Sequence, residues 1–416
     1  MANNVYIGSR YVPIFDGTWD NTKSYEALVI VEYGNNTYTS KKPVPAGTLP
    51  TNNTYWALTG NYNGQINNLQ KQIDKLHCMV NVTEVATGSN ITSALNTILG
   101  QGKIPYIPSG SYSINSKVFI PDGLGIYGAP DAIVTSNTGN DSFGMGDNTF
   151  LKGFKIYDSS SSGTYSVISI PNKTNVDIIN IKISNAYYIG IGIHLSKNVN
   201  ITGCTISTRT HDGIARYKGP NSFINGNSVN IIGNTLENIG LDGISFGGTV
   251  NIVNNRILNC GEAASAAGIY GAESSDSVIR GNLISATTGN GIDIAGDSGS
   301  NIHNKITENR VQNTDGVGIL LKRGNRNIIE QNFIYNTGRV GSVNGGAAIS
   351  VLGTTYNTLI QFNYVNGNPN SAFYLASTVV NAIFDTNDVE GGTTPATYAS
   401  DGSPNYYTFD KTAHTI

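Results

Sequence analysis

The sequence predicts an all-β solenoid, a coil of short strands stacked along one axis. From about residue 149 the chain repeats a unit of roughly 20 to 30 residues, a period typical of solenoids. Each copy pairs a Gly-Ile-x-aliphatic element, such as GISF at 243–246, with an aliphatic-x-x-Asn-x-aliphatic element, such as IVNNRI at 252–257. The segments are short and β-branched, and they follow neither the Leu offsets of leucine-rich repeats nor the 3.6-residue spacing of helices. One such unit cannot bury its own apolar face, so copies must stack about 4.8 Å apart.

One position of the repeat is occupied by a column of asparagines. Phe154, Ile181 and Cys204 take the same position in the earlier copies. Stacked amides at a bend can hydrogen-bond one another and the backbone, which satisfies polar groups inside a coil. We therefore interpret the column as structural; it comprises Asn234, Asn255, Asn282, Asn309, Asn332, Asn363 and Asn387.

The chain before the repeat has a different composition. Residues 1–60 hold both tryptophans, and strands are expected near 27–33 and 36–40 between turns rich in Pro and Gly. The segment resembles the N-terminal module of fibres and appendages of bacteriophages that infect Gram-positive bacteria. It is also similar to small chitin-binding modules, through the spacing of Trp19, Tyr25, Tyr33, Tyr38 and Trp56. These resemblances imply attachment to other virion proteins or stacking on sugars, whereas the same aromatics would also suit the core of a small sheet.

Residues 61–82 are predicted to form a helical stalk. Ile66, Leu69, Ile73, Leu76 and Val80 follow one another by three and four residues, which is a heptad seam. Isoleucine at both a positions with leucine at d permits dimers or trimers. The alternative is a single helix that packs against the module or against the end of the solenoid.

A capping helix is expected at 91–99, with Ile91, Leu95, Ile98 and Leu99 on one face and Gly100 near its end. The segment IPSGSY at 107–112 follows. Over about residues 85–395 the chain resembles the superfamily of pectate lyases, polygalacturonases and phage tailspikes. This resemblance implies a right-handed, single-stranded parallel β-helix of about ten coils over 83–395, followed by a tail or cap at 396–416. Phage spikes of this kind are usually trimers, so a homotrimer is expected.

Composition excludes several classes of protein. The chain has 416 residues, 13% of them charged, and a formal net charge of −3, which gives no basic footprint for nucleic acid or for anionic lipid. The first residues contain no apolar segment typical of a secretion signal, and no stretch is long enough for a membrane span. Cys78, Cys204 and Cys260 are widely spaced and predict no disulfide framework and no zinc site.

Chemistry is expected around the Gly-Ile elements. Strand alternation predicts that the x residue points outward. The x column is predicted to run through His194, Ala215, Ser245, Tyr270, Asp293, Leu320, Ser350 and Tyr374. A second column lies just before the glycine and includes Asp212 and Asp242, which would be neighbours on adjacent coils.

Paired carboxylates are what glycosidic hydrolysis requires, since one protonates the leaving oxygen while the other activates water or attacks the sugar. The alternative interpretation is that aspartate before Gly-Ile caps a corner through backbone N–H groups. The acid–base candidates are Asp212, Asp242, Asp293 and Glu273. No metal ligand set is predicted and no cofactor is expected, although calcium would be compatible with the acidic residues.

Four long insertions, at 216–223, 261–268, 295–301 and 338–346, fall in the region of the solenoid that carries these acidic candidates. Loops on a rigid scaffold usually carry binding. Tyr217 and Tyr270 are expected to stack on sugars, and Lys218, Lys322 and Arg323 to hold anionic groups. The full set of substrate-binding candidates is His194, His211, Arg216, Tyr217, Lys218, Tyr270, Asp297, Lys322 and Arg323.

The sequence thus predicts a phage tail spike or appendage located in the virion, which binds and depolymerises a host cell-surface polymer such as wall teichoic acid or capsular polysaccharide. Hydrolysis is favoured over a lyase reaction. The motifs that accompany catalysis in polygalacturonases are incomplete, since only NTDG at 313–316 is present. The alternatives are a receptor-binding spike without activity and a bacterial polysaccharide lyase or hydrolase.

Overall fold

The computed structural model describes residues 13–34, 36–60, 79–217, 229–261, 266–295, 301–339, 346–367, 371–376, 378–390 and 396–398. The chain divides into two compact units, Met1–Met79 and Val80–Ile416. The predicted stalk at 61–82 falls largely outside the described residues, as does the predicted tail at 396–416.

The first unit contains a four-stranded sheet in the order β1 (Ile14–Thr18), β2 (Val29–Tyr33), β3 (Asn36–Ser40) and β4 (Trp56–Gly60). β1 pairs with β2 in parallel, and the other two pairings are antiparallel. Its core consists of Tyr25, Val31, Val44 and Trp56. Trp19 lies at the rim of this core, with its ring 5.3 Å from that of Tyr33.

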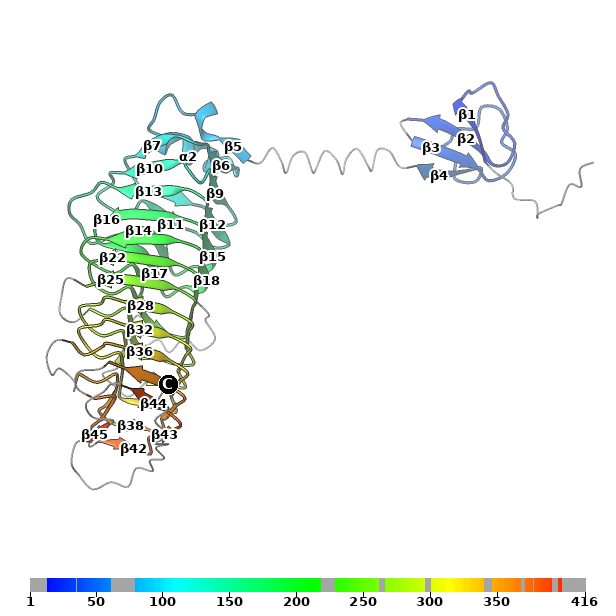
Figure 1. The fold of residues 1–416 in the computed structure, drawn as a ribbon. Coiled ribbons are helices and arrows are strands. Elements are labelled where there is room, and N and C mark those ends of the chain that lie inside the picture. Colours follow the sequence, from blue (N-terminus) through cyan, green and yellow to red (C-terminus); the bar gives the residue numbers. More distant parts are fainter. Residues whose placement is uncertain are drawn as a thin grey trace, which may run out of the picture. The chain divides into compact units, whose positions relative to one another are not determined.

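The second unit is a solenoid in which each coil contributes one strand to each of three long sheets (Figure 1). Neighbouring strands of these sheets pair in parallel, as Ile191 of one coil pairs with Ile214 of the next. Sheet 1 consists of β7 (Ser111–Ile114), β10 (Ile133–Ser136), β13 (Lys155–Asp158), β16 (Lys182–Ala186), β19 (Thr205–Thr208), β22 (Thr235–Ile239), β25 (Arg256–Cys260), β28 (Leu283–Ser285), β32 (Arg310–Gln312), β36 (Phe333–Tyr335), β40 (Tyr364–Asn366) and β44 (Asp388–Glu390).

Sheet 2 follows sheet 1 within each coil and carries the Gly-Ile elements. It consists of β8 (Val118–Ile120), β11 (Phe143–Met145), β14 (Ser166–Pro171), β17 (Ile189–His194), β20 (Ile214–Tyr217), β23 (Ile244–Gly248), β26 (Ile269–Ser274), β29 (Ile292–Ala295), β33 (Ile319–Lys322), β37 (Ile349–Leu352), β41 (Phe373–Leu375) and β45 (Ala396–Tyr398).

Sheet 3 closes each coil. It consists of β5 (Met79–Asn81), β6 (Ile104–Ile107), β9 (Gly125–Gly128), β12 (Thr149–Lys152), β15 (Thr174–Ile179), β18 (Lys197–Thr202), β21 (Val229–Ile232), β24 (Val250–Val253), β27 (Val278–Arg280), β31 (Lys305–Thr307), β35 (Ile328–Glu330), β39 (Leu359–Gln361) and β43 (Ile383–Asp385). A short sheet 4 lies between sheets 2 and 3 in the later coils and consists of β30 (Asn301–Ile302), β34 (Gly324–Asn325), β38 (Thr355–Tyr356) and β42 (Val379–Val380).

The fold is the all-β parallel solenoid that the repeat predicts. Within the described residues, sheets 1 and 2 have twelve strands each, which corresponds to about twelve coils rather than the ten predicted. The difference arises in the first coils, before Phe154, where the sheet 2 strands β8 and β11 form without the Gly-Ile signature.

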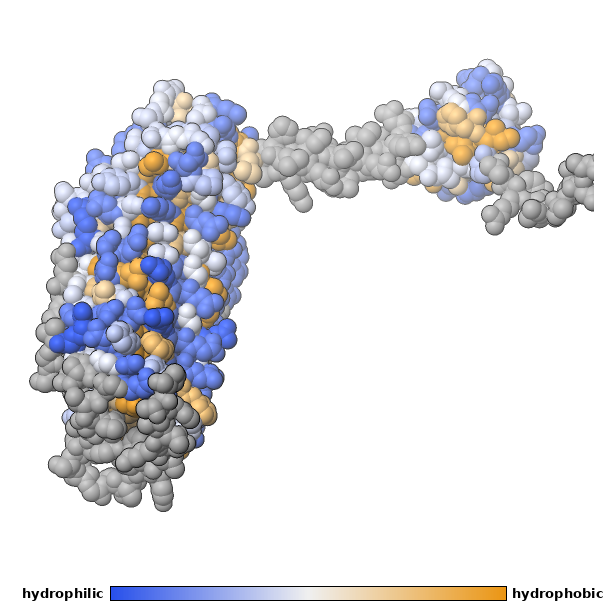
Figure 2. All heavy atoms as spheres, viewed as in Figure 1, coloured by the Kyte–Doolittle hydropathy of each residue, from blue (hydrophilic) through white to orange (hydrophobic). Residues whose placement is uncertain are grey.

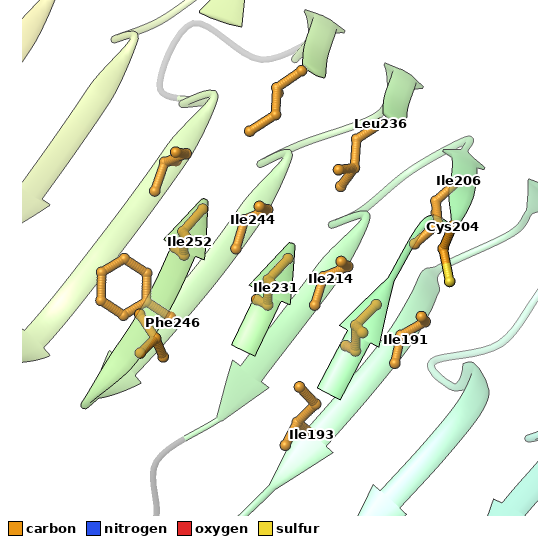
Figure 3. Close-up of a cluster of buried hydrophobic side chains, with 14 of the residues drawn as sticks. Ile191, Ile193, Cys204, Ile206, Ile214, Ile231, Leu236, Ile244, Phe246 and Ile252 are labelled. Atoms are coloured by element: carbon orange, nitrogen blue, oxygen red, sulfur yellow. The ribbon is translucent and has the colours of Figure 1, made fainter. Parts of the chain in front are cut away.

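One continuous core runs inside the coils and consists mainly of isoleucine and valine. In Figure 3, isoleucines of sheet 2 such as Ile191, Ile214 and Ile244 lie in one row and meet Ile231 and Ile252 of sheet 3. At the start of the coils α2 (Thr92–Gly100) contributes Leu95, Ile98 and Leu99 to this core, after the short 3-10 turn η1 (Val82–Glu84). Hydrophilic residues cover most of the visible outer surface, with hydrophobic side chains as smaller patches (Figure 2).

The asparagine column lies at the bend between sheets 3 and 1. Asn309 donates from Nδ2 to Asn332 Oδ1 at 3.0 Å and to the carbonyl of Ile279 at 2.9 Å, and it accepts from Asn282. The same pattern runs from Asn234 to Asn387. Cys204, which precedes the column, is buried, and its backbone N–H donates to Asn234 Oδ1 at 2.8 Å. The structural interpretation of the column agrees with these bonds.

A second inner amide column was not foreseen. It lies at the bend before sheet 3, where Asn304 donates from Nδ2 to Asn327 Oδ1 at 3.0 Å and Ser277 precedes it on the coil before.

No helix in the described part of the chain is long and apolar enough to cross a membrane.

Candidate functional site

The corner between sheets 1 and 2 requires glycine. A Cβ atom on Gly213 would lie 2.7 Å from the carbonyl oxygen of Gly243, and one on Gly243 would lie 2.5 Å from that of Gly268. At Gly213 and Gly243 successive coils therefore approach too closely for a side chain, which explains the glycine of the Gly-Ile element in these coils. The residue before each glycine consequently stands beside its counterpart on the next coil, and this places Asp212 next to Asp242.

Both aspartates are buried and hold the backbone of the following coil. Asp212 Oδ1 accepts a hydrogen bond from the N–H of Asp242 at 3.2 Å, and Asp242 Oδ1 accepts one from the N–H of Ala267 at 2.6 Å. Asn290 continues the column and accepts from the N–H of Val317 at 2.8 Å. Within the described residues, neither Asp212 nor Asp242 uses its second carboxyl oxygen in a hydrogen bond. Both aspartates thus stabilise the corner by binding the backbone of the next coil, and in the described residues one oxygen of each carboxyl forms no hydrogen bond.

Asp293 joins these residues from the outward column of β29. It is only 7% exposed, and its Oδ2 accepts from Asn290 Nδ2 at 2.7 Å. Its Oδ1 is buried and has no hydrogen-bond partner in the described part of the structure. Burial raises the pKa of this carboxyl, against the opposing effects of the Lys322 charge and the Asn290 hydrogen bond.

The pKa of Asp242 lies well above the ordinary range of an aspartate. Burial first, and then the charges of Asp212 and Asp293, raise its pKa to about 7, against the N–H of Ala267 and the charge of His211. Near neutral pH it therefore holds a proton for much of the time, as a general acid must. Burial first, and then the charges of Asp242 and Asp212, raise the pKa of the Cys260 thiol, which lies beneath the corner.

His211 completes the group. Its Nδ1 lies 3.3 Å from Asp212 Oδ1, and its ring centroid lies 4.1 Å from that of Tyr188. We call His211, Asp212, Asp242 and Asp293 the acidic corner. It brings together three of the four acid–base candidates predicted from the sequence.

The fourth, Glu273, lies apart from the acidic corner. Tyr270 pairs with Asp293 in the sheet, and Glu273 follows Tyr270 by three residues, which is roughly 10 Å along a strand. Tyr270 is half-buried on the outer face of sheet 2. Lys322 is near enough to affect the acidity of Asp293, whereas Arg323 is exposed in the following turn.

Two sequence predictions need correction. His194 is not in the x column, because Gly190-Ile191 and not Gly192-Ile193 aligns with Gly213-Ile214; His194 pairs with Tyr217 at the strand end. Arg216 does not face a groove. It occupies an inward position, 6% exposed, and donates from Nη1 to the carbonyls of Gly247 at 2.9 Å and Thr249 at 2.7 Å, while burial lowers its pKa to about 10.

Lys218 and Asp297 lie outside the described residues, and so does the side chain of Tyr217. In the described part no group of three His, Cys, Asp or Glu residues is arranged to hold a metal ion.

Sequence reasoning missed a pocket of about 450 Å³ at the same corner, whose lining includes Thr208, Arg209, Asn238 and Asn259. The signal that could have revealed this pocket is the position of its residues within the repeat. Asn238 and Asn259 are the next-to-last residues of β22 and β25 on adjacent coils, and Arg209 precedes Asp212 by three residues.

Residues 131–311 and 222–355 match the sequence family described as right handed beta helix region, and together the two matches span more than half of the chain. The chain belongs to the right-handed β-helix family. Members of this family share the coil of parallel sheets seen in Figure 1. No curated protein sequence matches this β-helix chain.

Solved structures agree with the fold. The A-module of the Azotobacter vinelandii mannuronan C-5 epimerase AlgE4 superposes with a TM-score of 0.59 at 13% identity, over 79% of this chain and 99% of that one. PfbA, a surface adhesin of Streptococcus pneumoniae, gives a TM-score of 0.56 at 13% identity, over 80% and 93%. The Dettilon tailspike protein gp208 gives 0.48 at 18% identity, over 76% and 69%, and a TM-score this low supports no inference. At these identities the matches establish the β-helix fold alone.

Proposed function

We propose that this β-helix protein binds a cell-surface glycopolymer and cleaves it by acid–base hydrolysis at the acidic corner. The observation that carries the proposal is the raised pKa of Asp242, which lies beside Asp212 and within the field of Asp293. A carboxyl that stays protonated near neutral pH, beside another carboxyl on the next coil, is the pairing that glycoside hydrolysis uses.

In this mechanism Asp242 donates its proton to the glycosidic oxygen as the bond to the sugar breaks. Asp212 attacks the anomeric carbon, and water then releases the sugar while Asp242 takes back a proton. Adjacent coils are about 4.8 Å apart, closer to the spacing of about 5 Å in retaining enzymes than to the wider spacing of inverting ones. Cleavage with retention of configuration is therefore expected.

The biological setting is part of the same proposal. We place the protein in a phage virion, as a homotrimeric tail spike or appendage that acts on wall teichoic acid or capsular polysaccharide of a Gram-positive host. The support is the resemblance of residues 1–60 to appendage modules, through which other tail or neck proteins would bind. A bacterial polysaccharide-acting enzyme is the alternative, since the epimerase module shares the fold.

The test is to incubate the purified protein with cell-wall extract of candidate hosts and measure the release of fragments. Asp242→Asn keeps the oxygen that accepts the N–H of Ala267 but removes the acid, so release should fall by about 10²-fold or more while polymer retention persists. Asp388→Asn, at an exposed position on sheet 1, should leave release unchanged. Undiminished release by Asp242→Asn would refute the catalytic role.

A specific observation favours a second candidate, a spike that binds its receptor without cleaving it. Asp212, Asp242 and Asn290 all use a side-chain oxygen to hold the next coil, which is a structural role that needs no substrate. This candidate predicts retention of intact polymer and no released fragments from the wild-type protein.

A further inference from the structure

The outer face of sheet 1 carries a column of positively charged side chains. The column occupies the first outward position of each strand, and the strands from β13 to β32 lie one after another along the axis (Figure 1). The hydrogen-bonded register fills this position, coil by coil, with Lys155, Lys182, Thr205, Thr235, Arg256, Leu283 and Arg310. We call its two lysines and two arginines the cationic column.

The cationic column is open to solvent and has no acidic member, although the whole chain has more acidic than basic residues. Lys182, Arg256 and Arg310 are exposed, and Lys155 is half-buried. Within the described residues, none of the four forms an ion pair with a carboxylate. Their charges are therefore accessible to a partner outside the chain.

Acidic side chains near the column are few. A hydrogen bond from Ser109 first, and the charge of Lys155 more weakly, lower the pKa of Asp131, which lies just before β10. Glu308 lies at the bend before β32. On the outer face of strands β13 to β32 themselves, Glu237 is the one carboxylate, and it is half-buried in the second outward column. The face therefore keeps a positive charge.

Arg310 is held on this face by neutral neighbours. Its Nε donates to Gln312 Oε1 at 2.8 Å, and its guanidinium lies 5.1 Å from the ring centroid of Phe333 on the next coil. Both contacts fix the arginine without cancelling its charge. The planar fork of an arginine positioned in this way matches the oxygens of phosphate and carboxylate groups.

The spacing of the column suits a chain rather than a small anion. Lys155 and Lys182 are direct neighbours in the sheet, about 4.8 Å apart, and like charges in this arrangement repel each other. A bound polyanion would relieve that repulsion. From Lys155 to Arg310 the column covers six steps between coils, or roughly 29 Å, which is long enough to contact several units of a polymer.

The column also passes the coils of the acidic corner. Thr205 and Thr235, its neutral middle members, start the sheet 1 strands that lead to Asp212 and Asp242. A chain that lies along the column therefore stays on the coils where cleavage is proposed.

We propose that the outer face of sheet 1 binds an anionic glycopolymer lengthwise, through the phosphate or carboxylate groups of its repeating units. The inference rests on the proposed function for the polymer itself and adds its charge and the face that holds it. Because the three aspartates of the acidic corner repel an anionic chain, a separate cationic surface is what would let such a chain approach them. A nucleic acid fits less well, since the whole chain has a net charge of −3 and the column is one residue wide.

The experiment measures equilibrium binding of the full chain to poly(glycerol phosphate), polyglutamate and neutral dextran. The two anionic probes contain no glycosidic bond, so cleavage at the acidic corner cannot affect the result. Wild-type protein should bind at least one anionic probe more tightly than dextran, and this binding should weaken as salt screens the charges. The preferred probe distinguishes phosphate from carboxylate.

A matched pair of double variants locates the binding face. Lys182→Gln with Arg256→Gln removes two charges of the cationic column and should weaken anionic binding about fivefold, since exposed ion pairs contribute a factor of about two to five each. Lys197→Gln with Arg280→Gln removes one exposed lysine and one exposed arginine from sheet 3. This second pair of changes should alter anionic binding less than twofold.

A gain of binding covers the case in which the loss variants fold poorly. Thr235→Lys adds a charge to the column beside Arg256 and should strengthen anionic binding about twofold. Val278→Lys adds a charge beside Lys305 on the outer face of sheet 3, also at a half-buried β-branched residue. It should leave anionic binding unchanged.

The inference is overturned if neither anionic probe binds, if the two double variants weaken binding equally, or if Thr235→Lys and Val278→Lys have the same effect. Duplex DNA that binds more tightly than either probe would also overturn it, in favour of a nucleic-acid partner. Undiminished fragment release by Asp242→Asn would refute the catalytic proposal and leave this one standing, because the anionic probes report binding alone.

Discussion

Asp242 stabilises the fold and destabilises it through the same carboxyl group. Its oxygen holds the N–H of Ala267, and this bond links two coils. Its charge, however, has to be accommodated under burial beside Asp212 and Asp293, which is why its pKa rises to about 7. The protonated form is thus the one that the folded protein tolerates best.

This balance predicts how stability depends on pH. Between the ordinary pKa of 3.8 and about 7, the folded protein holds a proton at Asp242 that the unfolded chain has released, so stability falls as pH rises through this window. Asp242→Asn removes this loss, which is on the order of a few kcal/mol. The melting temperature of the variant should exceed that of the wild type at pH 8 and match it near pH 4. A constant difference at both pH values would contradict this explanation.

At single residues, sequence reasoning succeeded where a column of identical neighbours set the position and failed where two positions competed. The segment Gly190-Ile191-Gly192-Ile193 offers two equivalent Gly-Ile pairs, and only the hydrogen-bonded register shows that the first belongs to sheet 2 as Gly213-Ile214 does. Arg216 was misread because its charge suggested the surface, whereas alternation placed it inside.

Inside the coils, asparagine side chains at the bends between strands form hydrogen bonds to one another and to the backbone. Asn309 takes part in hydrogen bonds to Asn282, Asn332 and the carbonyl of Ile279. On the outside, Asn251 donates to Asn230 on a half-buried surface, and it makes no other side-chain hydrogen bond within the described residues. Asn309 and Asn251 each bond to an asparagine of a neighbouring coil. Asn309 is buried and Asn251 is half-buried, so their contributions to stability should differ.

We therefore expect Asn309→Ala to lower the melting temperature much more than Asn251→Ala. The first leaves several buried groups without partners, at about 1–3 kcal/mol each, and the second leaves groups that water can reach. Thermal unfolding followed by circular dichroism measures both. Equal shifts would mean that the inner column contributes little beyond packing.

The inner column was readable from the sequence because the same residue recurs over seven coils. The second inner column was not, because Ser277, Asn304 and Asn327 change residue type and involve few coils. The pocket around Arg209 was hidden for a related reason. Its residues come from three coils and meet only through stacking, and no single stretch of sequence contains them.

For the whole molecule, the repeat was sufficient to predict the solenoid, since most coils after about residue 149 have the same pattern of strands and bends. The site was less predictable, because the burial and the electrostatic environment of a side chain depend on residues from several neighbouring coils. The raised pKa of Asp242 comes first from its burial between coils, and then from the charges of Asp212 on one coil and Asp293 on another.

The division into two units predicts that residues 80–416 fold without residues 1–79. The shortened protein should keep the melting transition of the solenoid. The predicted stalk at 61–82 can be tested in the same experiment by sedimentation: the full chain should have three times its mass of 44.1 kDa, and the shortened protein should be smaller in subunit number. A full chain that sediments as a monomer would rule out the trimer.

The asparagine column also shows which changes in the length of a coil the fold can accommodate. Successive rungs are 21 residues apart in one coil and 31 in another, yet each rung makes the same bonds to the next. Residues can thus be added to one coil without shifting the register of those that follow. Such a protein can acquire new surface loops, and with them new ligands, while its scaffold remains the same.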